Sequence, residues 1–184
     1  MIKFVYLDRH WANIKHHYYE GLDDLWSQGK VVYEDLNVVD LIKQHTNRKY
    51  VTLTNSCTDA ITMMIEATVK PGSEIICPAY SYYATASAIT RAGCKPVFVD
   101  VDENYHINLD KVDVGPNTKG LIYVSLFGNP IDYEAVKDFC KTNNIICFED
   151  AAQSFGASYN KVKSGSAGLC SALSFSPSKP SPTF

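Results

Sequence analysis

LIYVSLFGNPIDYEAVKDFCKTNNIICFED, residues 121–150, is the stretch of this chain that decides the fold. It begins with one apolar run, Leu121–Leu126, and includes a second, Ile145–Phe148. Both runs are apolar on both faces, as expected of strands that are covered by helices on either side. The segment between them, Tyr133–Asn143, has a helical pattern. Such a strand–helix–strand unit predicts two parallel strands joined by a crossover helix.

The same alternation continues in both directions from this stretch. Further strands are expected at Tyr50–Leu53, Glu74–Cys77, Pro96–Asp100 and Leu169–Phe175, and further helices at Cys57–Thr68 and Tyr82–Ala92. Another amphipathic helix is marked by Leu36, Val39 and Ile42, and Tyr159–Ser164 is typical of a polar turn between two short extended segments. The predicted fold is therefore α/β, with a doubly wound, mostly parallel sheet flanked by helices.

The composition is that of an ordinary globular protein. The 184 residues fit one domain, and 46% hydrophobic with 20% charged residues argues against disorder. A formal net charge of −3 gives no electrostatic reason to expect nucleic acid or a membrane surface as a partner. The N-terminus lacks the apolar core of a signal peptide, and no run approaches membrane-spanning length, so a cytoplasmic protein is expected. The six cysteines are scattered without a C-x-x-C pair, which favours free thiols over disulfides or a metal site.

Two residues suggest a chemistry. Asp150 ends an apolar strand, where open α/β sheets place their ligands, and Lys179 follows in a turn rich in serine and proline. This pair suits a pyridoxal-phosphate enzyme, in which the lysine forms a Schiff base and the carboxylate keeps the pyridine nitrogen protonated. The alternatives are a helix N-cap for Asp150 and a solvated loop lysine for Lys179.

Two other segments that follow strands could complete such a site. Asn55–Asp59 joins a strand to a helix, so its free N–H groups and hydroxyls could hold a phosphate, or Ser56 or Thr58 could simply cap the helix. Pro78–Tyr83 could stack an aromatic ring on a flat cofactor, or its tyrosines could be core or interface residues.

Taken in order, these segments resemble the DegT/DnrJ/EryC1/StrS family of sugar aminotransferases, whose fold is that of the large domain of fold-type-I pyridoxal-phosphate enzymes. The similar motifs are NSCTDAI, PAYSYYATASAI, EDAAQSFGA and SFSPSK. The resemblance implies that Lys179 and Asp150 are catalytic, with Lys179 as Schiff-base lysine and proton shuttle. It further implies that Thr58, the backbone of Asp59 and Ser174 contact the cofactor's phosphate. Cys57, which replaces the glycine of many members, would also contact the cofactor. Tyr82 would stack on the cofactor ring, and Gln153 would bond the ring hydroxyl.

The family moves an amino group, commonly from glutamate, onto a keto group of a nucleotide-linked sugar. The members that dehydrate sugars replace the lysine with histidine, so Lys179 favours transfer. By the same resemblance, residues 1–184 form the cofactor-binding large domain, with an N-terminal segment at 1–35, an α/β core at 36–179 and a Pro-rich end at 180–184.

Relatives continue into a smaller domain that contacts the sugar and the partner subunit, so a homodimer or a partner chain is expected. Two alternatives remain open. One is a truncated remnant that keeps the fold without catalysis, and the other is sugar dehydration or aldol cleavage on the same scaffold.

Overall fold

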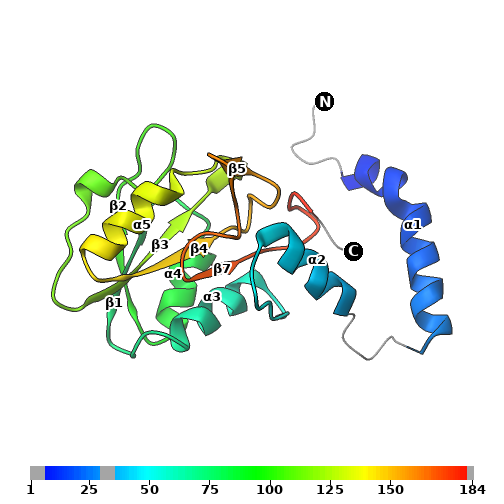
Figure 1. Ribbon diagram of the computed structural model, residues 1–184, viewed down its shortest axis with the longest axis horizontal. Helices are drawn as coiled ribbons and strands as arrows, with labels where there is room; N and C mark the ends of the chain where they lie inside the picture. The colour runs from blue at the N-terminus through cyan, green and yellow to red at the C-terminus, as the bar shows by residue number, and fades with distance from the viewer. Residues whose placement is uncertain (1–6, 30–35, 182–184) are drawn as a thin grey trace.

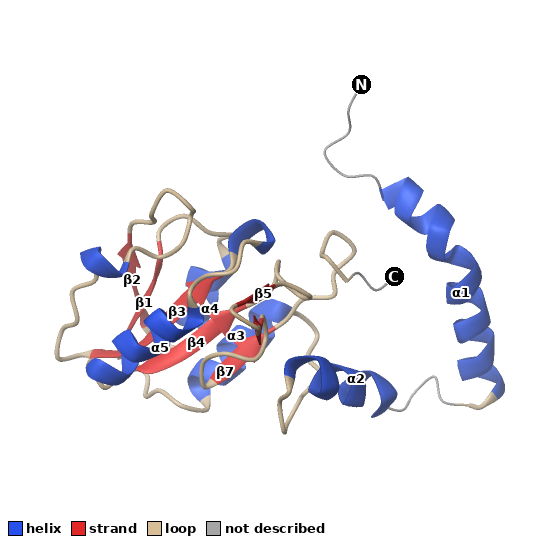
Figure 2. Ribbon diagram, turned by 45° about the horizontal axis from the view of Figure 1, so that its top comes forward, coloured by secondary structure: helices blue, strands red, loops and turns tan. Residues whose placement is uncertain are grey.

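The computed structural model describes residues 7–29 and 36–181. Its centre is a five-stranded sheet, whose place among the helices is seen in Figures 1 and 2. The order of the strands is β2-β1-β3-β4-β7, and every neighbouring pair is parallel. Their bounds are β1 Glu74–Pro78, β2 Lys95–Val99, β3 Thr118–Val124, β4 Ile146–Asp150 and β7 Cys170–Ala172. The predicted α/β fold is confirmed.

The order of the strands creates a reversal between β1 and β3. The chain passes from β1 outward to β2 and then returns to β3 on the other side of β1. In open α/β sheets, ligands bind at the carboxyl ends of the strands near such a switch point. The topology therefore places a binding crevice at the edge where β1, β3 and β4 end.

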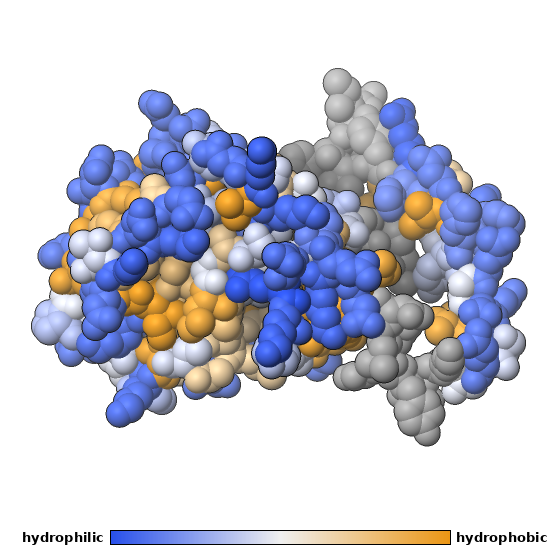
Figure 3. Space-filling model, viewed as in Figure 1, coloured by the Kyte–Doolittle hydropathy of each residue, from blue (hydrophilic) through white to orange (hydrophobic). Residues whose placement is uncertain are grey.

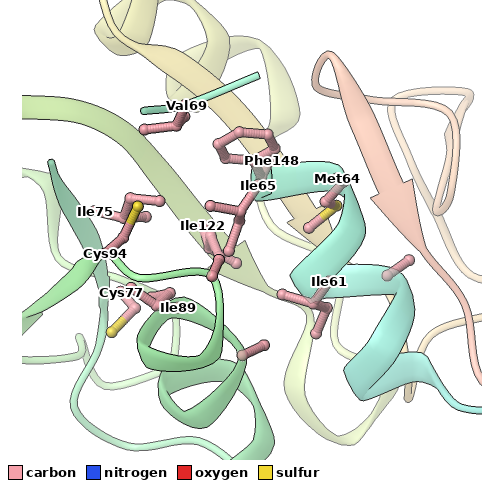
Figure 4. Packing of buried hydrophobic residues seen from close by; sticks show 13 residues of the cluster. Ile61, Met64, Ile65, Val69, Ile75, Cys77, Ile89, Cys94, Ile122 and Phe148 are labelled. Carbon is pink, nitrogen blue, oxygen red and sulfur yellow. The ribbon is translucent and has the colours of Figure 1, made fainter. Parts of the chain in front are cut away.

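Helices cover both faces of the sheet and form two core clusters. On one face α3 (Cys57–Glu66) and α4 (Ala84–Arg91) pack over β1, β3 and β4, and Figure 4 shows Ile65 and Phe148 among the residues of this cluster. On the other face α5 (Tyr133–Thr142) packs through Val136 against Leu121 and Tyr123 of β3. The burial of both faces explains why the strands are apolar on both sides.

The structure corrects one predicted strand. Tyr50–Leu53 belongs to no sheet, and Tyr50 is 77% exposed, so its side chain gains little from burial. The predicted strand at Leu169–Phe175 is shorter than expected, because only Cys170–Ala172 pairs with β4. The predicted polar turn is confirmed, since it joins the antiparallel strands β5 (Ser158–Tyr159) and β6 (Val162–Lys163).

Two helices precede the sheet. α2 (Leu36–Thr46) buries Val39 and Ile42, as predicted, while the side chain of Leu36 lies outside the described residues. α1 (Leu7–Ser27) was not predicted; it buries no residue, and Figure 3 shows it as mostly hydrophilic with separate apolar spots. Residues 1–6 and 30–35 of the N-terminal segment, and 182–184 of the Pro-rich end, also lie outside the described part.

Candidate functional site

A cleft of about 1050 Å³ lies at the carboxyl edge of the sheet. It is bounded by the start of α3, the segment after β1, the ends of β3 and β4, and the chain that follows β7. Seven of the eight predicted site residues line it: Cys57, Thr58, Tyr82, Asp150, Gln153, Ser174 and Lys179. Segments far apart in the sequence therefore meet where the switch point of the sheet predicts a ligand.

Asp150 is the buried acid of the cleft. It is 5% exposed, and its carboxylate accepts hydrogen bonds from Thr85 Oγ1 (2.8 Å, at Oδ2) and from the Ala152 N–H (3.2 Å, at Oδ1). Burial raises its pKa, whereas these two donors and the charge of Lys179 oppose the rise. Ala152 belongs to a turn and not to a helix, so the N-cap alternative is wrong.

Lys179 lines the cleft in the segment that follows β7. Its backbone N–H donates to Ser176 O (2.9 Å), which closes a turn, and its Nζ lies 5.9 Å from the centre of the Tyr82 ring. The Tyr82 side chain is well exposed, at 58%, so a ligand can reach its ring. Burial raises the pKa of the partly buried Cys57 thiol and of Asp150, and the charge of Lys179 opposes the rise in both.

The start of α3 provides hydrogen-bond donors. Ser56 is its N-cap, and Ser56 Oγ accepts the N–H of Asp59 (3.1 Å), so the capping alternative holds for Ser56. The N–H groups of Cys57 and Thr58 open the helix and have no intrahelical carbonyl to bond, which leaves them for an anion. Asp59 itself faces a shallower groove, where its carboxylate pairs with Arg91 (2.9 Å).

Gln153 and Ser174 extend the cleft. Gln153 Oε1 accepts the N–H of Phe127 (2.8 Å), which fixes the side chain and leaves its amide N–H groups for a ligand. Ser174 is almost buried in the wall, at 8% exposed. Both residues therefore line the cleft as predicted, whereas their predicted contacts with a cofactor remain predictions.

Thr85 supports the candidate site and was not predicted from the sequence. It lies in the first turn of α4 and is 2% exposed, and its hydroxyl holds Asp150 across the interface between helix and sheet. A threonine in the first turn of a helix is too common to single out, so no local signal identifies it.

The donor set fits pyridoxal phosphate. Among residues 7–29 and 36–181, none forms an ion pair with Asp150, so a buried carboxylate is left with two hydrogen bonds and room for a cation such as a protonated pyridine ring. The same cleft holds free helix N–H groups for a phosphate and a lysine for an aldehyde. The described residues contain no cluster that could hold a metal ion, and none of their helices is long and apolar enough to cross a bilayer.

Comparison with known proteins gives a consistent family. The profile of the DegT/DnrJ/EryC1/StrS aminotransferase family matches residues 32–184. The chain is 35% identical to UDP-2-acetamido-2-deoxy-3-oxo-D-glucuronate aminotransferase of Pseudomonas aeruginosa, over 98% of this chain and 52% of that enzyme. It is 30% identical to GDP-perosamine synthase of Caulobacter vibrioides, over 89% of this chain and 45% of that enzyme.

Solved structures agree with this result. NtdA from Bacillus subtilis, with the cofactor PMP bound, matches with a TM-score of 0.91 at 26% identity, over 100% of this chain and 43% of that one. S. venezuelae DesV matches with a TM-score of 0.92 at 24% identity, over 100% of this chain and 51% of that one, which shows the fold alone. The chain thus spans about half the length of the relatives described here, at 43% to 52%.

Proposed function

Because the chain belongs to the DegT/DnrJ/EryC1/StrS aminotransferase family, we propose that it forms the pyridoxal-phosphate-binding part of a sugar aminotransferase. The enzyme would move an amino group from glutamate onto a keto group of a nucleotide-linked sugar. One observation carries the proposal: Asp150, a buried carboxylate without an ion pair among the described residues, shares a cleft with Lys179. The chain covers about half of its relatives, so transfer by this chain is part of the proposal.

The residues of the cleft would divide the work of such an enzyme. The bound cofactor supplies an electron sink for the carbanion that forms when a proton leaves the α-carbon of the amino donor. Asp150 would keep the ring nitrogen protonated, and its low exposure strengthens that interaction because little water competes. Lys179 Nζ would hold the aldehyde and would move the proton between the α-carbon and the 4′-carbon.

The remaining residues would orient the cofactor. The Cys57 and Thr58 N–H groups, with the Thr58 and Ser174 hydroxyls, would bind the phosphate at the positive end of α3. The exposed ring of Tyr82 would stack on the cofactor, and the Gln153 amide would donate to the ring hydroxyl.

Binding is tested by adding pyridoxal phosphate to the purified chain. The yellow colour of a lysine-bound aldehyde is expected, and borohydride reduction followed by peptide mass mapping should place the label on Lys179. Lys179→Ala should remove both signals. Lys119→Ala, which changes an exposed lysine outside the cleft, should leave them unchanged. A wild-type chain that shows no label at saturating cofactor would refute the proposal.

Transfer is tested separately with glutamate and a nucleotide-linked keto-sugar. The first substrate to try is the 3-oxo sugar nucleotide in the name of the Pseudomonas relative. Formation of an amino-sugar nucleotide together with 2-oxoglutarate supports transfer. A chain that attaches the cofactor at Lys179 yet produces neither product is a binding unit, as the non-catalytic alternative states. The exposed side chains of Tyr80 and Tyr83, on either side of Tyr82 in the sequence, support a partner subunit there, which sedimentation analysis of the chain would detect.

A further inference from the structure

A second buried carboxylate, Glu149, lies beside Asp150 on β4 and holds the segment Ser164–Ser171, called here the 164–171 loop. Glu149 is 0% exposed and accepts four hydrogen bonds. Oε1 accepts from Ser164 Oγ (3.1 Å) and from the Gly165 N–H (2.9 Å), and Oε2 accepts from the Ala167 N–H (3.3 Å) and from Ser171 Oγ (2.7 Å). The donors of all four bonds belong to the loop, so the carboxylate ties this segment to β4.

Arg48, which follows α2, binds the same loop through its carbonyl groups. Its guanidinium donates to the carbonyls of Gly165 (3.1 Å), Ala167, Gly168 (3.1 Å) and Leu169 (3.3 Å), and to Ser171 Oγ (2.9 Å). The loop therefore lies between a cation and a buried anion. The Ser171 hydroxyl joins them, because it accepts from Arg48 and donates to Glu149.

This arrangement fixes the register of β7. The strand has three residues and forms one edge of the sheet, so its backbone ladder is short. Ser171 lies opposite Glu149 and Ala172 lies opposite Asp150. A slip by one residue would place Cys170 or Ala172 opposite Glu149, and neither can replace the serine hydroxyl. The same slip would move the chain beyond β7 by about 3.3 Å.

We propose that Arg48, Glu149 and Ser171 form a clamp that positions Ser174 and Lys179 against Asp150. These three are positioning residues in this proposal: Glu149 is fully buried, and Arg48 and Ser171, which lie in the wall of the cleft, bond the loop and Glu149. They act through β7 and the segment that follows it. The proposal deepens the function proposed above and rests on it for the role of Lys179. A planar guanidinium can bond several carbonyls at once, which a lysine ammonium at position 48 cannot do in the same geometry.

The first readout is amide hydrogen exchange of the cofactor-free chain. In Arg48→Met and Glu149→Gln, amide exchange of β7 (residues 170–172) should quicken about tenfold or more, together with that of residues 164–169. Arg9→Met and Glu134→Gln, the same changes on the exposed faces of α1 and α5, should leave it unchanged. If residues 164–169 quicken while residues 170–172 of β7 keep their wild-type protection, the clamp holds only the segment before the strand and the proposal fails.

The second readout is the attachment of pyridoxal phosphate to Lys179. Arg48→Lys and Ser171→Ala, which are milder changes, should slow attachment about tenfold while the chain stays folded by circular dichroism. They should also shift the pH at which attachment is half-maximal, whereas a general loss of rigidity elsewhere in the chain would leave that pH unchanged. Wild-type attachment rates and midpoints in these folded variants would overturn the proposal. If the unaltered chain takes up no cofactor, the proposed function fails, while the exchange experiment still decides the clamp.

Discussion

The hydrogen bond from Thr85 to Asp150 gives the sharpest test of the site. Thr85→Val keeps the shape of the side chain and removes the donor 2.8 Å from Oδ2. Thr85 is 2% exposed, so water has no access to replace the lost bond. A hydrogen bond to a charged group contributes about 1.5–3 kcal/mol, and we expect a loss of that size in the free energy of unfolding near neutral pH.

The loss should depend on pH in a defined direction. Burial raises the pKa of Asp150 in the folded chain, so its contribution to stability is present at low pH and is lost as the pH rises through the folded pKa. The Thr85 hydroxyl opposes that rise in pKa, and its removal raises the pKa further. The penalty is therefore largest above the folded pKa of Asp150, and at acidic pH below that pKa it should fall to the value of a neutral hydrogen bond, about 1 kcal/mol.

The assay is urea unfolding of the cofactor-free chain at both pH values. Thr85→Ser, which keeps the hydroxyl, should recover most of the loss. Thr62→Val is the matched control, because the buried Thr62 hydroxyl donates to a neutral carbonyl, that of Thr58 (2.9 Å), and its loss should not change with pH. If Thr85→Val costs the same at both pH values, the reasoning about an ionised, uncompensated Asp150 is refuted.

Three further predictions concern the same region. Asp150→Asn should make the cofactor-free chain more stable than wild type at neutral pH, by a margin that shrinks on acidification, while cofactor affinity measured by titration falls. Burial raises the pKa of the Cys57 thiol, so this thiol should react slowly with iodoacetamide at neutral pH in the folded chain and faster in urea. Peptide mass analysis would measure the two rates, and equal rates would contradict the prediction. Gly168→Ala adds a Cβ 2.9 Å from the Cys147 carbonyl oxygen at φ +70°, and should lower the free energy of unfolding in urea by about 2–4 kcal/mol. Gly72→Ala, at φ +86° with no atom near the added Cβ, should lower it by about 1–2 kcal/mol. Similar losses for the two glycines would show that the close approach is relieved by a small shift.

The sheet was predictable because its strands carry their own signal. Runs such as Leu121–Leu126 and Ile145–Phe148 are apolar on both faces, and helices cover them on both faces in the structure. The position of Asp150 followed from the same pattern, since a residue that ends a parallel strand lies at the ligand-binding edge. The segment Tyr50–Leu53 has a similar composition but gained no partner strand, and composition alone does not show whether a partner exists.

The residues that support the site were not predictable, because their roles depend on long-range pairing. Thr85 meets Asp150 across 65 positions, and Arg48 reaches the 164–171 loop across 117 to 123 positions. Neither residue differs locally from a common helix or loop residue. α1 is a different case: it carries apolar residues at helical spacing, among them Trp11, Ile14 and Tyr18, and was still not predicted, although none of its residues is buried in the structure.

The two adjacent carboxylates at the end of β4 show how a structural acid differs from a functional one. Both are buried, and burial raises the pKa of each. Among the described residues, however, the 164–171 loop donates four hydrogen bonds to Glu149, whereas Asp150 receives two. A buried charge that the chain fully satisfies has no free energy left to gain from a ligand. Asp150 still has free energy to gain, and a cation bound beside it would offset its desolvation. Because the Asp150 carboxylate is not fully hydrogen-bonded, the cofactor-free chain is less stable and binds a cationic ring more tightly. In Asp150→Asn, the free energy of unfolding should therefore rise while the affinity for the cofactor falls.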